Sequence, residues 1–247
     1  MNAPSSEVLV QVAGLSRRFG SVVAVDDLSF EVRGGECLGL LGPNGAGKST
    51  TLAMLVGQLA PDRGTVTVLG LDCTTQRADV MRFLGYVPDS PQWQDGLTAR
   101  QLLRFVGWSH GSRGTALREM VEVALAEQGL AGVGDRSASA FSLGMAKRLA
   151  LAAASLHAPR VLVLDEPGSA LDPPGQADLD ERIRGWVRGG AGVLLCTHQV
   201  EQAERVCDRI LLLARGRLVA DGTASELCAR AGTRTLREAF HALNPTP

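Results

Sequence analysis

The chain has 247 residues, with 25 basic and 26 acidic side chains and a formal net charge of -1. Such a length suits one large or two small domains, and the balanced charge argues against a nucleic-acid partner. No apolar run approaches the roughly 18 residues of a membrane span, and the opening MNAPSSEV lacks the blocks of a signal peptide, so we expect a cytoplasmic protein.

The five cysteines are scattered through the chain without a C-x-x-C spacing, and their odd number does not suit a disulfide framework. Cys37 and Cys196 lie in apolar runs. We therefore expect them to be small buried hydrophobes, without metal or redox chemistry.

The first part of the chain predicts a small sheet. Short β-type alternation, a β-branched segment and an apolar segment ended by Pro88 are typical of strands. Strands are expected at 8–12, 22–32, 64–69 and 85–87, with an exposed helix at 72–83 and turns at Gly14, Gly20 and 34–35.

A glycine-rich segment interrupts this pattern. The apolar run 38–41 predicts a buried strand, and a helix is expected at 49–59. Between them lies GPNGAGKS, which fits G-x-x-x-x-G-K-[ST] at every fixed position. Strand, glycine loop and helix N-terminus in this order are typical of a phosphate site.

The composition of this loop suits a nucleoside triphosphate. Glycines let backbone N–H groups turn toward phosphate oxygens, and the helix N-terminus adds unpaired N–H groups and a positive dipole end. Lys48 supplies a full charge for the β- and γ-phosphates, and the Ser49 hydroxyl can ligate Mg²⁺. The residues expected to hold the nucleotide are Gly42, Pro43, Asn44, Gly45, Ala46, Gly47, Lys48, Ser49 and Thr50.

From residue 89 to residue 157 the β signals disappear. Apolar residues at helical spacing predict helices at 98–109, 115–128 and 143–157, so a helical subdomain is inserted into an α/β core. Trp93 and Trp108 could belong to the core or to an exposed docking surface. We expect the core, the commoner place for tryptophan.

The α/β core resumes after this insertion. Strands are expected at 161–164 and 193–197, helices at 176–188 and 200–206, a hairpin at 210–214 and 217–220, and two short helices at the end. The chain reads as one globular unit with two lobes.

Polar residues follow two of these strands. Asp165 and Glu166 come directly after 161–164, and the carboxyl ends of parallel strands meet at the edge that also carries the glycine loop. Asp165 is therefore expected to hold Mg²⁺, and Glu166 to orient and deprotonate the water that attacks the γ-phosphate. His198 follows the next strand. A lone histidine there is more often structural, but its position favours contact with the γ-phosphate or the attacking water.

Taken together, these motifs resemble the ATP-binding subunit of an ABC transporter over about residues 8–243. The segment 42–49 resembles Walker A, 161–166 Walker B, 142–146 the signature, 169–172 the D-loop, and His198 the switch histidine. Phe19 matches the aromatic that stacks on adenine.

This resemblance implies a fold and a set of cofactors. The expected fold is an α/β P-loop NTPase (RecA-like) core with an N-terminal antiparallel β subdomain and an inserted α-helical subdomain. Within one domain, 1–247, the core spans 8–88 and 160–222, the helical signature subdomain 89–159 and the C-terminal helices 223–247. The implied cofactors are ATP and Mg²⁺.

The resemblance also implies a composite site. Two cassettes meet head to tail, either as a homodimer or with a related cassette, and each ATP lies between Walker A of one and the signature of the other. Ser142 and Gly144 are then expected to face the γ-phosphate across the interface.

Two positions depart from the family's pattern. Leu143 stands where the signature usually has glycine, in a form that resembles drug- and antibiotic-export cassettes. Asp89 stands where the lid usually has glutamine. We expect Asp89 to contact Mg²⁺ and the γ-phosphate if the loop moves closer, with Gln92 or Gln94 as substitutes.

The resemblance implies a separate transmembrane permease, which would place the chain on the inner face of the cell membrane. A groove with Trp93 and Leu97 is the expected docking surface. The leading hypothesis is therefore that the chain is the ATP-hydrolysing motor of an exporter. A soluble ABC ATPase of a cytosolic assembly, such as iron–sulfur cluster biogenesis, is the alternative, and a scaffold without turnover is disfavoured because Glu166 and His198 are both present.

Overall fold

The computed structural model describes residues 7–93 and 95–244, so Gln94 lies outside the described residues. Two sheets form its centre. The smaller sheet is antiparallel with the order β2-β1-β4-β5, and the larger has six strands in the order β10-β9-β3-β8-β7-β6. In the larger sheet only β10 runs antiparallel to its neighbour. The expected α/β fold with an antiparallel β subdomain is confirmed.

Most strands lie close to where the sequence pattern predicts them, but β1 is longer than the predicted 8–12 and β5 was not predicted. In the small sheet they are β1 Val8–Phe19, β2 Val22–Arg33, β4 Arg63–Val68 and β5 Leu71–Asp72. In the large sheet they are β3 Cys37–Leu41, β6 Leu84–Val87, β7 Val161–Asp165, β8 Gly192–Cys196, β9 Arg209–Ala214 and β10 Arg217–Gly222.

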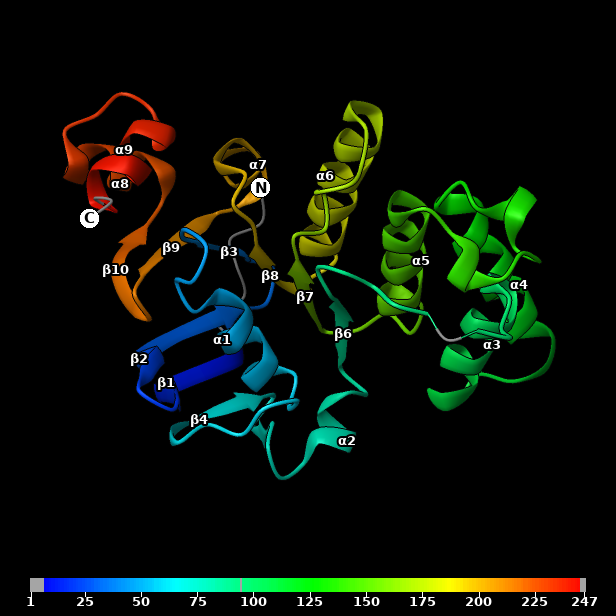
Figure 1. Ribbon diagram of the computed structural model, residues 1–247. Helices are drawn as coiled ribbons and strands as arrows, with labels where there is room; N and C mark the ends of the chain where they lie inside the picture. Colours follow the sequence, from blue (N-terminus) through cyan, green and yellow to red (C-terminus); the bar gives the residue numbers. More distant parts are fainter. Residues whose placement is uncertain (1–6, 94, 245–247) are drawn as a thin grey trace.

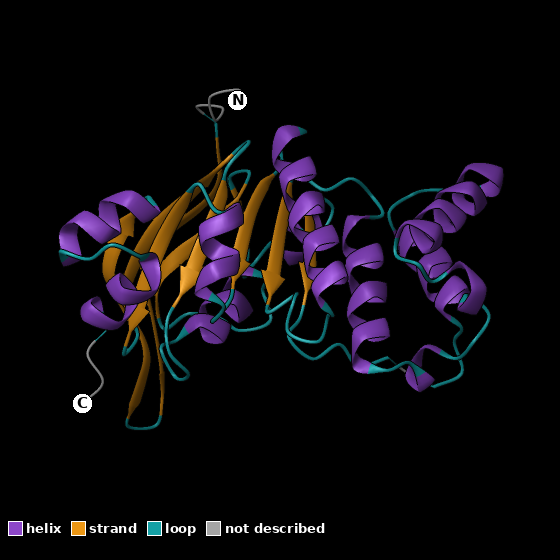
Figure 2. Cartoon of the chain, turned by 90° about the horizontal axis from the view of Figure 1, so that it is seen from above, coloured by secondary structure: helices purple, strands orange, loops and turns teal. Residues whose placement is uncertain are grey.

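The helices divide between the two lobes seen in Figure 1 and, from above, in Figure 2. A separate helical lobe holds α3 Ala99–Ser109 and α4 Gly114–Glu127 and is joined to the core by α5 Leu143–Ser155. The core carries α1 Lys48–Leu55, α2 Arg77–Val80, α6 Pro173–Arg188, α7 Val200–Val206, α8 Ala224–Ala231 and α9 Leu236–Leu243. No described helix is both long enough and apolar enough to cross a membrane.

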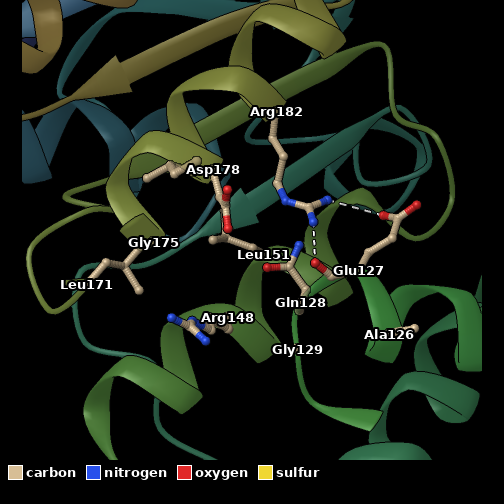
Figure 3. Close-up of a pocket in the computed structure, with 11 residues that line it drawn as sticks. Ala126, Glu127, Gln128, Gly129, Arg148, Leu151, Leu171, Gly175, Asp178 and Arg182 are labelled. Atoms are coloured by element: carbon tan, nitrogen blue, oxygen red, sulfur yellow. Dashed lines mark hydrogen bonds and ion pairs between the residues drawn. The ribbon is translucent and has the colours of Figure 1, made fainter. Parts of the chain in front are cut away.

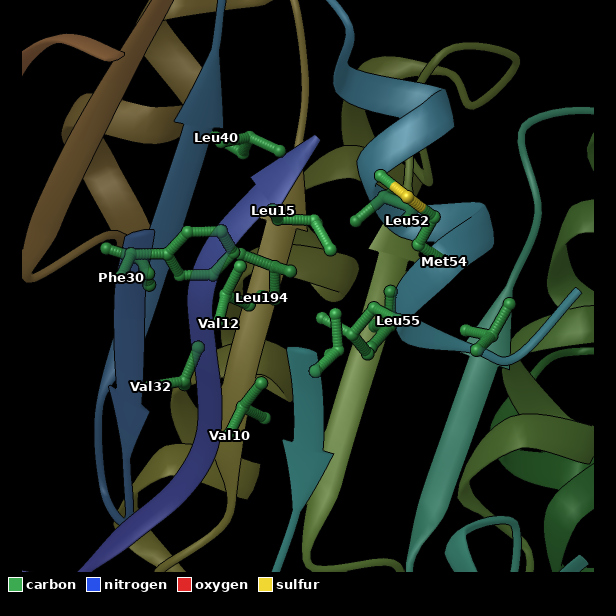
Figure 4. Packing of buried hydrophobic residues seen from close by; sticks show 14 of the residues in the cluster. Val10, Val12, Leu15, Phe30, Val32, Leu40, Leu52, Met54, Leu55 and Leu194 are labelled. Carbon is green, nitrogen blue, oxygen red and sulfur yellow. The ribbon is translucent and has the colours of Figure 1, made fainter. Parts of the chain in front are cut away.

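The strands of the large sheet are apolar throughout because both faces are covered. On β8, Leu194 and Cys196 pack in the cluster between the two sheets, whereas Val193 and Leu195 pack against α5, α6 and α7. Figure 4 shows the first cluster, where side chains of β1, β2 and α1 meet Leu194. A strand buried on both faces needs apolar residues at every position. Cys37 and Cys196 are fully buried, as expected.

A core substitution should test this packing. Leu194→Ala is expected to lower the free energy of unfolding by about 2–5 kcal/mol, because it deletes methyl groups of a fully buried side chain and leaves a cavity. Urea unfolding measures the loss. The control Val123→Ala, at a side chain that is 57% exposed on α4, should stay within roughly 0.5 kcal/mol of wild type. Equal effects of the two changes would contradict the assigned core.

Two predicted helices are shorter than the sequence pattern indicates. The helix expected at 49–59 ends at Leu55, because Gly57 has φ +67° and a Cβ there would lie 2.3 Å from the Cys73 carbonyl oxygen. The helix expected at 72–83 is reduced to α2. Its first residues are not helical, because Asp72 ends β5 and pairs with Thr67 of β4. In the turn that follows, Asp72 Oδ1 accepts hydrogen bonds from Thr74 N at 3.0 Å and Thr75 N at 2.8 Å.

Two further predictions need correction. β1 continues through Gly14, where the register with β2 shifts between Val12 and Leu15, so the turn predicted there is an irregularity within a longer strand. Trp108 is 54% exposed on α3, so the core prediction is wrong for this residue. Trp93, in contrast, is half-buried and packs against both the core and the helical lobe, as the core prediction for this residue expects.

Candidate nucleotide-binding site

The glycine loop connects β3 to α1 and is shaped by its contacts with neighbouring segments. Gly47 has φ +100°, and a Cβ at this position would lie 2.3 Å from the Ala24 carbonyl oxygen, so only glycine fits. The loop is braced by a hydrogen bond from Gly216 N to the Ala46 carbonyl at 3.0 Å. The N-terminus of α1 therefore opens onto the loop with its first N–H groups free for an anion.

Lys48 and Ser49 are the first residues beyond the glycines. The Lys48 side chain folds back over the loop, and its Nζ donates to the carbonyls of Gly42 at 2.6 Å and Pro43 at 3.1 Å. Ser49 is exposed at the start of α1. The Lys48 ammonium can therefore move to a phosphate without breaking an ion pair, because the two carbonyl groups that hold it are uncharged.

Asp165 lies at the same edge of the sheet. Asp165 is paired with Cys196 of β8, and Cys196 with Leu40 of β3, so the ends of the three strands are level. The Asp165 side chain is buried. Burial raises the pKa of its carboxyl group, while a hydrogen bond with Cys196 lowers it and the charges of Asp89 and Glu166 raise it further. A cation at this position would favour the ionised form.

Glu166 has an unusual backbone and a closely held side chain. Its φ is +46°, which is uncommon for a residue other than glycine, and its N–H donates to the Cys196 carbonyl at 2.8 Å. One carboxylate oxygen lies 2.8 Å from His198 Nδ1, and the other accepts from Thr197 Oγ1 at 3.3 Å. The structure thus brings together Glu166 and His198, which the sequence had placed only at the same edge.

Asp89, the residue expected to approach Mg²⁺, contacts a lysine of its own chain. It follows β6, and its Oδ1 lies 3.3 Å from the Nζ of Lys147, whose side chain is fully buried. Burial lowers the pKa of Lys147, and the nearby charges of Asp89, Glu166 and Asp165 raise it. In this structure Asp89 is therefore engaged by a cation of its own chain.

Sequence reasoning missed Lys147. It lies on the buried stripe of α5 with Ala146, Ala150, Leu151 and Ala154. A lysine within an apolar stripe of helical spacing was the signal that could have identified it, since lysine is almost never fully buried without a partner.

The signature segment begins α5 in the helical lobe, apart from α1 in Figure 1. Ser142 is exposed and caps the helix, accepting a hydrogen bond from Met145 N at 3.3 Å. A Cβ at Gly144 would lie 3.0 Å from the Ala170 carbonyl oxygen, so α5 begins close to the segment 169–172. Leu143, at the position that departs from the family's pattern, is 52% exposed.

Phe19 ends β1 with an exposed ring. The Arg17 guanidinium carbon lies 5.1 Å from the ring centroid, and Val22 and Val23 are exposed across the turn at the start of β2. An exposed aromatic ring beside aliphatic side chains can stack on a nucleobase.

A small cavity of about 200 Å³ lies between α4, α5 and α6, outside the predicted site. Figure 3 shows Arg182 of α6 reaching the end of α4, where it donates to the Glu127 carbonyl and lies 3.2 Å from the Glu127 carboxylate. These contacts tie the helical lobe to the core.

The available oxygens suit Mg²⁺ bound together with a triphosphate. Ser49 offers a hydroxyl and Asp165 one buried carboxylate. Across residues 7–93 and 95–244, no group of three or more His, Cys, Asp or Glu side chains could hold a metal by itself. Mg²⁺ needs no such group, because one or two protein ligands with water and phosphate oxygens complete its octahedron.

A glycine loop between a parallel strand and a helix N-terminus, with an acidic pair at the end of a nearby strand, defines a P-loop protein that binds nucleoside triphosphates. The model of the ABC transporter family matches residues 25–169. The chain belongs to this family and carries its ATP-binding domain.

Two curated relatives are similar over most of this chain. The "Nod factor export ATP-binding protein I" of Mesorhizobium japonicum is 39% identical over 222 residues, covering 88% of this chain and 64% of the relative. The "Probable multidrug ABC transporter ATP-binding protein YbhF" of Escherichia coli is 37% identical over 239 residues, covering 95% of this chain and 41% of the relative. The chain thus spans less than two thirds of the length of these relatives.

A solved structure described as an ATP binding subunit of an ABC transporter superposes with a TM-score of 0.90 at 31% identity. The superposition covers 95% of this chain and 99% of that one.

Proposed function

We propose that the chain is the ATP-hydrolysing motor subunit of an ABC exporter, and that it drives a separate transmembrane permease. The observation that carries the hydrolytic role is the seating of Glu166, whose carboxylate is held by His198 and Thr197 at the strand edge that also carries the glycine loop. The names of two relatives, one of Nod factor export and one of multidrug transport, support export.

In this proposal the residues of the site divide the work. The loop from Gly42 to Thr50 binds the phosphates through its N–H groups and the Lys48 ammonium, and Phe19 stacks on adenine. Mg²⁺, when bound, neutralises phosphate charge. Ser49 and Asp165 hold it. Glu166 accepts the proton of the attacking water, and His198 orients the Glu166 carboxylate through its 2.8 Å contact.

The proposal includes a head-to-tail dimer, either of two copies or with a related cassette. Ser142 and Gly144 begin a helix in the lobe apart from α1, and Ser142 is exposed. Their helix N-terminus is therefore available to the γ-phosphate of ATP bound to a second cassette. ATP then holds the closed dimer together, and hydrolysis releases it.

We propose that the permease docks on the helical lobe near α3, which places the chain at the inner face of the membrane. Phe105 and Trp108 of α3 are 63% and 54% exposed, and Leu97 before α3 is 38% exposed. Exposed large apolar side chains in one region are typical of a protein contact.

Leu97→Asp tests this surface. A carboxylate at a docking contact must be desolvated, so we expect the variant to capture about tenfold less permease at equal concentration. The measurement is co-purification of membrane protein with the tagged variant. MgATP affinity of the isolated chain serves as the check of folding. Full capture of the permease by Leu97→Asp would exclude Leu97 from the interface.

The proposed function is tested by affinity purification from detergent-solubilised membranes of the native source, with a Glu166→Gln bait that traps the ATP-bound dimer. Co-purification of an integral membrane protein with several spans supports the transporter reading. Recovery of soluble proteins alone overturns it in favour of a motor for a cytosolic assembly.

A further inference from the structure

Lysine is rare in this chain. Of the 25 basic residues only two are lysines, Lys48 and Lys147, and every other one is arginine. Lys48 belongs to the glycine loop, so Lys147 is the single lysine without a role in the proposed function. A lysine ammonium is a compact charge that can approach several acceptors in a closed space, whereas the planar arginine fork needs more room.

The surroundings of Lys147 explain why a compact cation is needed. Its side chain is 0% exposed, and its Nζ donates both to the Glu166 carbonyl and, at 3.3 Å, to Asp89 Oδ1. Asp165 adds a third acidic residue near this ammonium. A buried ammonium is tolerated only where acceptors and opposite charges surround it.

The contact with Glu166 bears on the backbone of the site. Glu166 has φ +46°, and a backbone in this region persists only where its surroundings hold it. The Cys196 carbonyl accepts from the Glu166 N–H, and Lys147 donates to the Glu166 carbonyl. The peptide groups on both sides of Glu166 are thus fixed, which sets the direction of its side chain toward His198.

We propose that Lys147 is a positioning residue for ATP hydrolysis, which holds the Glu166 carbonyl and the Asp89 carboxylate with one buried ammonium. This inference rests on the proposed function. It connects the helix that begins with Ser142 to the turn that presents Glu166 and to the lid residue Asp89. It also gives a reason for aspartate at the lid, because an acid there is matched by the cation of α5.

The first test replaces Lys147 with methionine, which keeps the length of the side chain and removes the charge. We expect kcat for ATP hydrolysis to fall about tenfold or more, while the Kd for MgATP stays within roughly threefold of wild type. Arg118→Met, at an exposed arginine of α4, is the control and should change neither. A kcat within twofold of wild type, or a parallel loss of kcat, MgATP binding and unfolding stability, overturns the inference.

The double variant Asp89→Asn/Lys147→Met tests the pairing. Removing both charges relieves the repulsion between Asp89 and the acids at the end of β7. We therefore expect the kcat of the double variant to be at least about threefold higher than that of Lys147→Met alone. If the fold-reduction in kcat of the double variant equals the product of the fold-reductions of the two single variants, the residues act independently and the pairing is overturned.

A third measurement needs no turnover. In the nucleotide-free protein, Lys147→Met should speed amide hydrogen exchange at least about tenfold in a peptide covering 161–172, and leave a peptide covering 209–214 unchanged. Unchanged exchange at 161–172 contradicts the role of Lys147 in holding Glu166.

The wild type and Glu166→Gln separate this inference from the proposed function. If wild type lacks glutamate-dependent ATP hydrolysis, both fail, whereas glutamate-dependent hydrolysis with an unaffected Lys147→Met refutes this inference alone.

Discussion

Glu166→Gln should lower kcat for ATP hydrolysis by a factor on the order of 10²–10⁴, the range for loss of a general base. The amide is nearly the same size as the carboxylate, and its oxygen can still accept a hydrogen bond from the Thr197 hydroxyl. The amide cannot, however, take a proton from water. Binding of MgATP should persist, because the phosphates are held by the glycine loop.

The measurement is steady-state phosphate release with purified protein, alongside equilibrium binding of MgATP. Glu119→Gln is the matched control, since it makes the same chemical change at an exposed position of α4. Turnover of Glu166→Gln within a few-fold of wild type would assign the base to another residue. Loss of MgATP binding as well would indicate a structural rather than a chemical effect.

Lys48→Met should weaken MgATP binding roughly 100-fold. A charge-assisted hydrogen bond contributes about 1.5–3 kcal/mol, and the ammonium is expected to contact both the β- and γ-phosphates. The Lys48 Nζ already lies within the loop, where it donates to the Gly42 and Pro43 carbonyls, so it needs to move little to reach the phosphates.

Isothermal titration with MgATP measures this loss. Arg118→Met removes a cation from an exposed helix position and should retain the wild-type affinity. Circular dichroism of Lys48→Met should match wild type, since the bonds that are lost are local to the loop. An unchanged Kd would show that the ammonium does not contact the phosphates.

The α/β fold and the location of the phosphate site could be predicted from the sequence because both depend on local patterns. The run CLGLL of β3 is apolar at every position, which indicates a strand covered on both faces. The glycine loop follows it directly, so the motif carries its own structural context.

Errors arose where distant residues decide a local structure. The helix expected at 72–83 begins only at Arg77, because Asp72 belongs to β5 and pairs with Thr67 of β4 in the small sheet. α1 ends early because the backbone at Gly57 approaches the Cys73 carbonyl. Trp108 lies on the exposed face of α3, which the periodicity of that helix alone did not reveal.

The strand–loop–helix unit with Lys48 and Ser49 could be predicted from the sequence, and so could the acidic residues at the end of β7. Each of these is a contiguous motif on one element. The contacts that these residues make could not be predicted in this way, because they come from the packing of separate elements. Glu166 meets His198 because β7 and β8 are neighbours in the sheet. Asp89 meets Lys147, 58 residues away, because α5 packs against β6. Such pairings depend on how elements pack, and packing is set by the whole core rather than by any one segment.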